Sequence, residues 1–382
     1  MRLTNTAWRR MDHQQVSCLQ RQWFSSCRPP QVRSRVESAL RGTSGRITLP
    51  NQFSGSATPP VDPTMATEAD VYHAYRLILR REPDRKGLAH YTGRVAAGLT
   101  LDGLLHSFLN SDERRRLVER QRRDAEAAVD LGGYQVVVHR DDSDFGAIIV
   151  SYKVYEEQVR QALREHLGPG DVCLDVGANV GVMTLLAASR VGPGGRVIAV
   201  EPNPDNVQLL YRGILLNGFT NVEVLPLAAA DHRAVFSLFG RSNTELVDAD
   251  SSDTNGRLVQ SVVLDEVLHD LPRLDLVKMD VEGHEPAVLR GLLRLVTTHR
   301  PTLVVEFNPC CLARRREDAV AFLGQILDLY PEIRAISPFG DDEPFRRADD
   351  LMAFWRRRAA EVTAEGKLPE GLLHFDLVTQ RD

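Results

Sequence analysis

The spacing of apolar and polar positions divides the chain into three parts. Residues 1–64 show poor apolar periodicity and hold nine Arg, no Lys and three acidic residues. We expect this first part to be disordered, an organelle transit peptide, or a non-native extension with translation starting at Met65. It is expected to contribute neither fold nor chemistry.

Residues 65–125 are predicted to form a small all-α domain. Its first helix carries apolar residues at helical spacing, namely Val71, Tyr75, Ile78 and Leu79. Pro83 and Gly87 are expected to end this helix, and a second short helix lies between Gly87 and Gly98. Thr100 and Ser111 can cap a third and a fourth. The fourth is rich in Arg, but interleaved acidic residues favour a solvated face over a nucleic-acid or membrane patch.

From about residue 130 the pattern changes to apolar strands that alternate with helices. Strand candidates are 172–176, 196–200, 222–227, 274–280 and 302–307. Helical stretches lie at 181–190, 204–217, 284–297 and 316–329. This alternation predicts a doubly wound, mostly parallel α/β sheet, in which ligands bind outside the carboxyl ends of the strands.

Composition narrows the class of protein. The 382 residues are 43% hydrophobic with a net charge of -5, so no basic field draws nucleic acid. No apolar run approaches the roughly 20 residues of a membrane helix. The five cysteines include no Cys-x-x-Cys, which fits a reducing compartment, and we expect a cytoplasmic protein.

The residues after the first two parallel strands suggest a nucleotide-like ligand. The turn D-V-G-A-N-V-G (175–181) joins a strand to a helix but lacks both the dinucleotide G-x-G-x-x-G and the P-loop G-K-[ST]. Glu201 follows the second strand, where its carboxylate can accept hydrogen bonds from both hydroxyls of an adenosine ribose. Asp175 would repel a phosphate and attract a cation, so S-adenosylmethionine fits better than NAD.

The third strand adds a place for the base. Ala228, Ala229 and Ala230 leave room for a flat ring, and Asp231 could accept a hydrogen bond from an exocyclic amine. The three strand ends together describe an adenosine pocket without a place for a pyrophosphate.

The motifs L-G-P-G-D-V-C-L-D-V-G-A-N-V-G, G-R-V-I-A-V-E-P-N-P-D-N, D-L-V-K-M-D-V-E-G-H-E-P-A-V-L-R-G and R-P-T-L-V-V-E-F occur in this order. Over about 150–310 they resemble the FkbM-type S-adenosylmethionine-dependent methyltransferases. The resemblance implies a Rossmann-like class I sheet of seven strands, one reversed, and O-methylation, often of sugars or secondary metabolites. We expect a catalytic domain over 130–382 with its core at 150–310. The implied donor-site residues are Asp175, Gly177, Ala178, Asn179, Gly181, Glu201, Asn203 and Asp231.

The segment after the fourth strand supplies candidates for catalysis. Transfer to an alcohol requires a base, and Asp280, Glu282 and His284 lie within six residues there. Glu306 ends another strand on the same edge. Clustered carboxylates could also hold a divalent metal, but no second oxygen-rich cluster is evident and no metal is expected. Tyr155 and Glu156 resemble a family position near the donor, but a packed helix face is the safer interpretation of both.

The helical domain resembles a domain of unknown function found in bacterial surface-associated proteins and beside glycan-modifying enzymes. The matching residues are Y-R-L-I-L-R-R-E-P-D-R-K-G-L-A-H-Y and F-L-N-S-D-E. It implies an accessory role, docking an unknown partner, while the acceptor is expected to be a small molecule or glycan. Two other classes stay open: a NAD-dependent oxidoreductase on a related sheet, and a non-catalytic binding or scaffold protein.

Overall fold

The computed structural model describes residues 65–142, 145–240, 244–248 and 256–380. The segment 1–64, for which disorder or a non-native extension is expected, lies outside the described residues. The described chain divides into two compact units that part between Glu126 and Ala127. Each unit is described by itself.

The described residues of the helical unit form four helices: α2 (Glu68–Ile78), α3 (Arg85–Ala96), α4 (Leu101–Leu109) and α5 (Asp112–Ala125). Its core is built around the Tyr75 ring, which packs edge-on against Tyr91 and Phe108. Thr100 caps α4 by accepting from the Gly103 amide, as expected. Helix α3 begins earlier than Gly87, because the Asp84 carboxylate caps the amides of residues 86 and 87.

The larger unit begins with the hairpin β1 (Glu126–Asp130) and β2 (Gln135–His139) and the helices α6 (Gly146–Tyr152) and α7 (Glu157–His166). The strands of its main sheet are β3 (Val172–Val176), β4 (Arg196–Val200), β5 (Val222–Leu225), β10 (Leu276–Met279), β11 (Thr302–Phe307), β12 (Ile333–Ile336), β13 (Asp342–Phe345) and β14 (Phe375–Val378). The helices between them are α8 (Val182–Val191), α9 (Pro204–Asn217), α10 (Leu264–Val267), α11 (Glu285–Arg290), α12 (Leu293–His299), α13 (Pro309–Arg314), α14 (Ala319–Leu329) and α15 (Ala348–Ala364).

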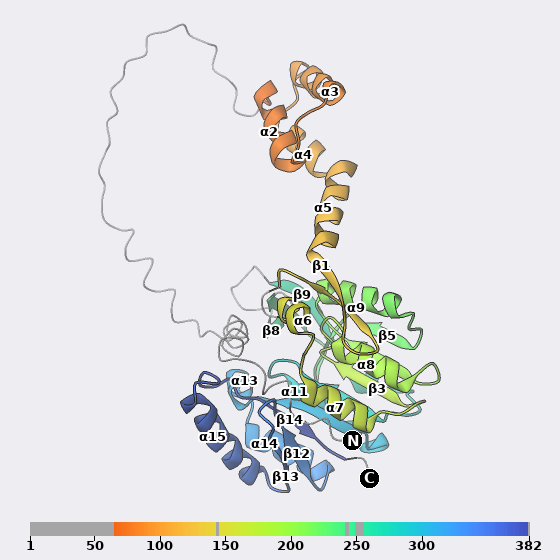
Figure 1. The fold of residues 1–382 in the computed structure, drawn as a ribbon, viewed down its shortest axis with the longest axis vertical. Coiled ribbons are helices and arrows are strands. Elements are labelled where there is room, and N and C mark those ends of the chain that lie inside the picture. The colour runs from red at the N-terminus through yellow and green to blue at the C-terminus, as the bar shows by residue number, and fades with distance from the viewer. Residues whose placement is uncertain (1–64, 143–144, 241–243, 249–255, 381–382) are drawn as a thin grey trace, which may run out of the picture. The chain divides into compact units, whose positions relative to one another are not determined.

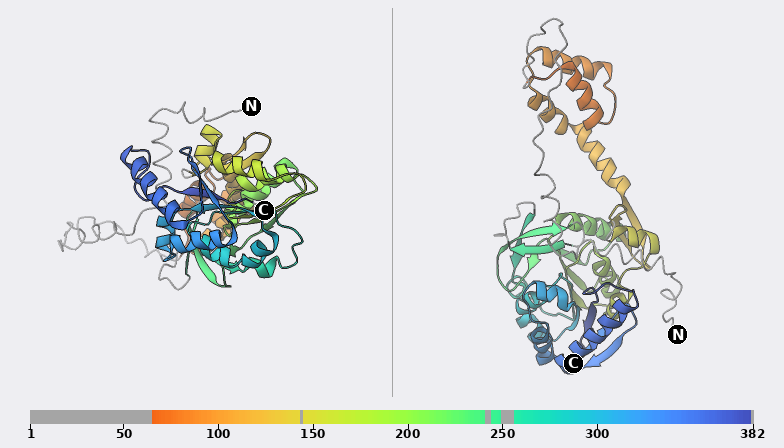
Figure 2. Two further views of the ribbon diagram at one scale, coloured as in Figure 1. Left: turned by 90° about the horizontal axis from the view of Figure 1, so that it is seen from below. Right: turned by 90° about the vertical axis from the view of Figure 1, so that its left-hand side faces the viewer.

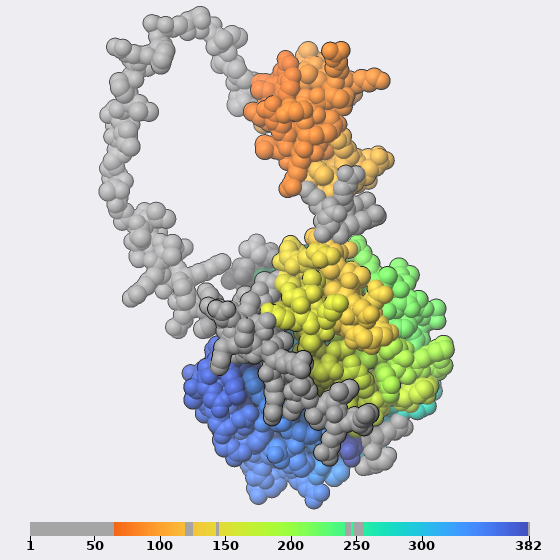
Figure 3. All heavy atoms as spheres, viewed as in Figure 1, coloured from red at the N-terminus to blue at the C-terminus, as the bar shows by residue number. Residues whose placement is uncertain are grey.

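The main sheet has the order β13-β12-β14-β11-β10-β3-β4-β5 (Figure 1). Strands β11, β10, β3, β4 and β5 are parallel, and β14 runs antiparallel to both of its neighbours. Seven strands with one reversed match the expected Rossmann-like arrangement. The hairpin partner β13 adds an eighth strand at the edge. The two edge strands belong to distant parts of the sequence, and the green and blue segments lie on opposite sides of this unit (Figure 3).

Helices cover both faces of this sheet (Figures 1 and 2). Because side chains alternate along a strand, Cys173 points into a core formed with α7, α8 and α9. Its neighbour Leu174 points into the opposite core, formed with α10 to α15. Burial on both faces explains why these strands read as continuous apolar runs.

Two parts of the larger unit differ from the sequence-based expectation. The predicted helix 284–297 is two helices, α11 and α12, which meet at Gly291; a Cβ there would lie 2.2 Å from the Ala230 carbonyl oxygen. A second sheet is formed by four strands that follow β5 and precede β10 in the sequence: β6 (Ala228–Ala229), β7 (Val235–Gly240), β8 (Thr244–Asp248) and β9 (Arg257–Val262). These strands are short and partly exposed, so their apolar and polar residues show no clear alternation.

Candidate functional site

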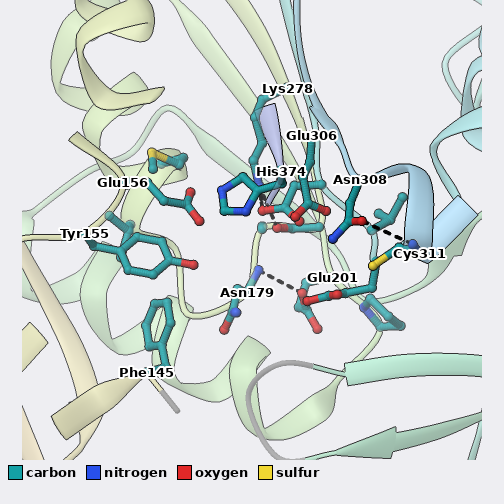
Figure 4. A pocket seen from close by; sticks show the side chains of 18 of the residues that line it. Phe145, Tyr155, Glu156, Asn179, Glu201, Lys278, Glu306, Asn308, Cys311 and His374 are labelled. Atoms are coloured by element: carbon teal, nitrogen blue, oxygen red, sulfur yellow. Dashed lines mark hydrogen bonds and ion pairs between the residues drawn. The ribbon is translucent and has the colours of Figure 1, made fainter. Parts of the chain in front are cut away.

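A pocket lies at the carboxyl ends of the parallel strands β3, β4, β10 and β11 (Figure 4). Its space, open solvent included, is about 1090 Å³. The polar lining residues are Tyr155, Glu156, Asn179, Glu201, Lys278, Asp280, Glu282, Glu306, Asn308 and His374. The position is the one at which open α/β sheets bind ligands.

The glycine turn forms one wall of this pocket, which we call the donor wall: Gly177, Ala178, Asn179 and Glu201. Gly177 has φ +81, and a Cβ there would lie 1.8 Å from the Asp280 carbonyl oxygen. Only glycine fits so close to the backbone of the neighbouring strand end. The Gly177 and Ala178 amides both donate to the Val200 carbonyl, so the turn is held to the end of β4.

Glu201 is held rigidly within the donor wall. One carboxylate oxygen accepts from the Asn179 amide and the other from the Asn203 amide, both at 2.8 Å. Burial raises the pKa of Glu201 to about 7, although these hydrogen bonds act in the opposite direction. Figure 4 shows the bond between Asn179 and Glu201 crossing the floor of the pocket.

Strand register brings polar side chains together on one face of the sheet. Lys278 on β10 pairs with Asp175 on β3, and Glu306 on β11 pairs with Asp376 on β14. Lys278 also pairs with Val304, so Glu306 lies two residues further along the same face. All four continue the apolar rows of the core that contains Cys173.

Lys278 connects this polar row to the glycine turn. Its ammonium lies 3.2 Å from Asp280 and 3.7 Å from Asp175, and it donates to the Gly177 carbonyl at 3.1 Å. Burial alone would lower the pKa of Lys278, but the charges of Asp280, Asp175 and Glu156 outweigh it and raise that pKa. The lysine therefore stays charged and fixes the turn against the end of β10.

The opposite wall, which we call the acceptor wall, consists of Glu156, Glu306, Asn308 and His374 (Figure 4). Burial raises the pKa of Glu156 well above its usual range, and the nearby charges of Asp280 and Asp376 raise it further. Burial and the charges of Asp280 and Glu282 do the same to the pKa of Glu306.

Two neighbours complete the electrostatics of this wall. Burial lowers the pKa of His374, so its ring is neutral at neutral pH. Burial also raises the pKa of Asp376 to about 7, although Gln158 donates to its carboxylate. The Glu306 carboxyl has no hydrogen-bond or ion-pair partner among the residues that the structure describes.

Seven of the predicted site residues line the pocket: Gly177, Ala178, Asn179, Glu201, Asp280, Glu282 and Glu306. Asp175 lies directly behind the turn. It is buried, accepts from Thr184 Oγ1 at 2.6 Å, and reaches the pocket only through its ion pair with Lys278.

Four further predicted residues do not line the pocket within the described chain. Gly181, with φ +95, allows close packing, because a Cβ there would lie 2.3 Å from Leu210. Asn203 caps α9 and supports Glu201 from behind. Asp231 instead binds Arg290 and His232, each at 2.7 Å. The alanines at 228–230, where the sequence predicted room for the nucleotide base, are buried: Ala229 in the core that contains Leu174, and the other two in a small separate core.

His284 is the fourth. Positive φ values at Glu282 (+55) and Gly283 (+95) turn the chain after β10. As a result the His284 ring lies against Phe236, with Nε2 3.3 Å from the Leu246 carbonyl oxygen. Its expected role as base is not supported by this position.

Sequence reasoning missed several lining residues. Lys278 could have been found, because a lysine at the centre of a buried strand needs a partner. Glu156 has a left-handed backbone (φ +41) just before α7, and its carboxyl faces the pocket, so the helix-face interpretation of this residue is wrong. Asn308 caps α13, and His374 precedes a strand that the sequence did not suggest.

Within the described ranges, no group of three His, Cys, Asp or Glu side chains is arranged to hold a metal ion. The same residues contain no helix long and apolar enough to span a membrane.

Comparison with known families identifies the region that carries the pocket. Residues 175–328 match the model of the methyltransferase FkbM domain, and residues 63–118 match a domain of unknown function, DUF4214. This part of the chain is thus similar to an FkbM-type methyltransferase domain. The match to this domain includes the donor wall, Lys278, Asp280 and Glu306.

Two known methyltransferases resemble parts of the chain. The hexuronic acid methyltransferase AglP of Haloferax volcanii is 29% identical over 145 residues, covering 36% of this chain and 56% of the relative. An arsenite methyltransferase of Halobacterium salinarum is 37% identical over 57 residues, 15% of each chain. The chain thus spans about half the length of the first relative and much less of the second.

Among solved structures, an FkbM methyltransferase from Methylobacillus flagellatus KT is 17% identical, with a TM-score of 0.34. The alignment covers 71% of this chain and 57% of that one.

Proposed function

We propose that the chain transfers a methyl group from S-adenosylmethionine to a hydroxyl group of a sugar, glycolipid or secondary metabolite. The observation that carries this proposal is the Glu306 carboxyl, which has no partner among the described residues and faces the donor wall across one pocket. The FkbM domain match and the sugar-directed relative support it.

Each wall has a separate task in this reaction. Glu201 accepts hydrogen bonds from the ribose hydroxyls, and the glycine turn lets the adenosine approach the backbone. The pocket carboxylates attract the sulfonium and ammonium charges of the donor. Lys278 keeps Asp280 and the turn in place while the donor enters.

The chemical step is an in-line displacement. The acceptor oxygen forms a bond to the methyl carbon as the bond from carbon to sulfur breaks, which leaves S-adenosylhomocysteine. Glu306, which the positive charge of the bound donor favours in its ionised form, takes the hydroxyl proton, and a base so placed contributes about 10²–10⁴-fold in rate. Alignment of the two reactants contributes about 7–11 kcal/mol.

The proposal assigns a separate task to each of two parts of the chain. Residues 130–382 form the catalytic domain, and residues 65–125 form an accessory domain that docks a partner. The cytoplasmic location expected from the sequence stays a prediction.

The test is donor binding followed by transfer. Calorimetry of the full chain should show binding of S-adenosylmethionine and of S-adenosylhomocysteine. Incubation with methyl-labelled donor and a glycan extract from the producing cells should then move the label to a sugar. A folded chain that binds neither compound would refute the proposal.

A further inference from the structure

The charge of the pocket restricts the acceptor more narrowly than the fold does. Glu156, Asp280, Glu282 and Glu306 are the carboxyls that line the pocket beside the donor wall. Among the described lining residues, Lys278 is the only lysine or arginine. The space that receives the acceptor is therefore surrounded by acids.

The positive charge of Lys278 is already engaged. Its ammonium donates to Asp280 and to the Gly177 carbonyl, and Asp175 lies 3.7 Å away as a second ion-pair partner. An acceptor carboxylate would have to compete with these two aspartates for the one positive charge. Breaking one partner away from a buried ion pair leaves an uncompensated charge and is strongly unfavourable.

The remaining polar groups of the acceptor wall add no positive charge. The His374 ring is neutral because burial lowers its pKa. Burial, and after it the charge of Asp280, raises the pKa values of Glu156 and Glu306. A further anion would lie beside four carboxyl groups with no second lysine or arginine among the described lining residues, whereas hydroxyl or ammonium groups would donate hydrogen bonds to the carboxyl oxygens.

We propose that the sugar ring methylated by this chain carries no acid group: it is a neutral hexose or an amino sugar, with hydroxyl or ammonium groups held by Glu156, Glu306, Asn308 and His374. This inference rests on the proposed function. The chain would thereby differ in substrate from its relative AglP, which is named for hexuronic acid methylation.

The experiment measures the charge of the methylated product. The full chain is incubated with methyl-labelled S-adenosylmethionine and a glycan mixture chosen to contain hexoses, amino sugars and uronic acids. After complete acid hydrolysis, the labelled monosaccharides are separated by ion exchange at neutral pH. We expect at least about ten times more label in the neutral and cationic fractions than in the anionic fraction, the ratio for a 1.4 kcal/mol discrimination.

Donor binding, measured beforehand by calorimetry, separates the two proposals. A chain that fails to bind the donor refutes the proposed function. A chain that binds the donor but labels chiefly a uronic acid, or labels no sugar in this mixture, overturns the acceptor assignment alone.

Discussion

The donor wall and the acceptor wall of the pocket are built by different means. The donor wall is backbone held by backbone, because the glycine turn is bonded to Val200 and both oxygens of Glu201 accept main-chain amides. The acceptor wall consists of side chains, and burial, with the neighbouring carboxylates second, raises the pKa values of its carboxyls. The donor wall is therefore fixed by main-chain hydrogen bonds, whereas the acceptor wall is built from titratable groups.

This contrast implies different responses to substitution. A change in the donor wall should affect binding of the donor, since its geometry is fixed before the ligand enters. A change in the acceptor wall should affect the rate of transfer and leave donor binding nearly intact.

The largest expected effect is on turnover in Glu306→Gln. The amide keeps the shape of the side chain but cannot take the hydroxyl proton, so kcat should fall about 10²–10⁴-fold. Donor affinity, measured by calorimetry, should change less than about threefold, because Glu306 belongs to the acceptor wall. For scale, a loss of about 1.4 kcal/mol in binding free energy is a tenfold change in affinity.

Glu223→Gln is the matched control, since Glu223 lies on β5 and pairs with Arg196 at the exposed edge. Its turnover should equal that of the native chain. If Glu306→Gln kept native turnover, the proton acceptor would have to be another group.

The second effect, on donor affinity, is expected in Gly177→Ala. The new Cβ would lie 1.8 Å from the Asp280 carbonyl oxygen, on a backbone with φ +81. Such overpacking costs about 1–3 kcal/mol, or roughly 5- to 150-fold in the affinity for S-adenosylhomocysteine if the turn shifts.

Gly194→Ala provides the comparison, because a Cβ at Gly194 would have no atom within 4 Å. The affinity of this control should be unchanged. Equal affinities in both variants would show that the turn does not contact the donor.

The two walls also differ in how far the sequence predicts them. The turn 175–181 and Glu201 belong to short local motifs, and β3 and β4 have the bounds read from the apolar runs at 172–176 and 196–200. Local patterns of this kind record the geometry of a turn, so the donor wall could be found from them.

The acceptor wall could not be found in this way, because it depends on strand register. Glu306 and Asp376 are 70 positions apart in the sequence, and they become neighbours only when β14 pairs antiparallel with β11. His284 shows the opposite error. It is adjacent to the motif in sequence, but two residues with positive φ turn its ring away.

The third prediction compares the two walls through proton release. Glu201 has a pKa of about 7, and hydrogen bonds from ribose hydroxyls favour its ionised form. Binding of either S-adenosylmethionine or S-adenosylhomocysteine should therefore release a fraction of a proton from Glu201. Only S-adenosylmethionine brings a sulfonium charge, which favours ionisation of Glu156 and Glu306 as well.

Calorimetry at pH 7 in two buffers of different ionisation enthalpy measures this release. We expect S-adenosylmethionine to release more protons than S-adenosylhomocysteine, by about half a proton. Equal release by the two compounds would mean that the acceptor wall does not sense the donor's charge.

The smallest expected effect is on stability, through Glu285→Gln below the acceptor wall. Burial and the nearby Asp280 charge raise the pKa of Glu285 to about 7, while the Val281 and Gly283 amides donate to its Oε1. Because this pKa exceeds the value of 4.5 in the unfolded chain, the protonated form stabilises the fold at low pH. That stability is lost as pH rises through 7.

Glutamine keeps the accepting oxygen and cannot ionise, so the variant should lose this pH dependence. At pH 8 its free energy of unfolding should exceed that of the native chain by about 1 kcal/mol, and at pH 4 the two should be equal. Denaturant unfolding at both pH values measures the difference. A variant less stable than the native chain at pH 8 would mean that the ionised Glu285 carboxylate stabilises the turn by more than the free energy that its burial costs. The repulsion among the carboxyls of the acceptor wall would then be weaker than the geometry of the pocket implies.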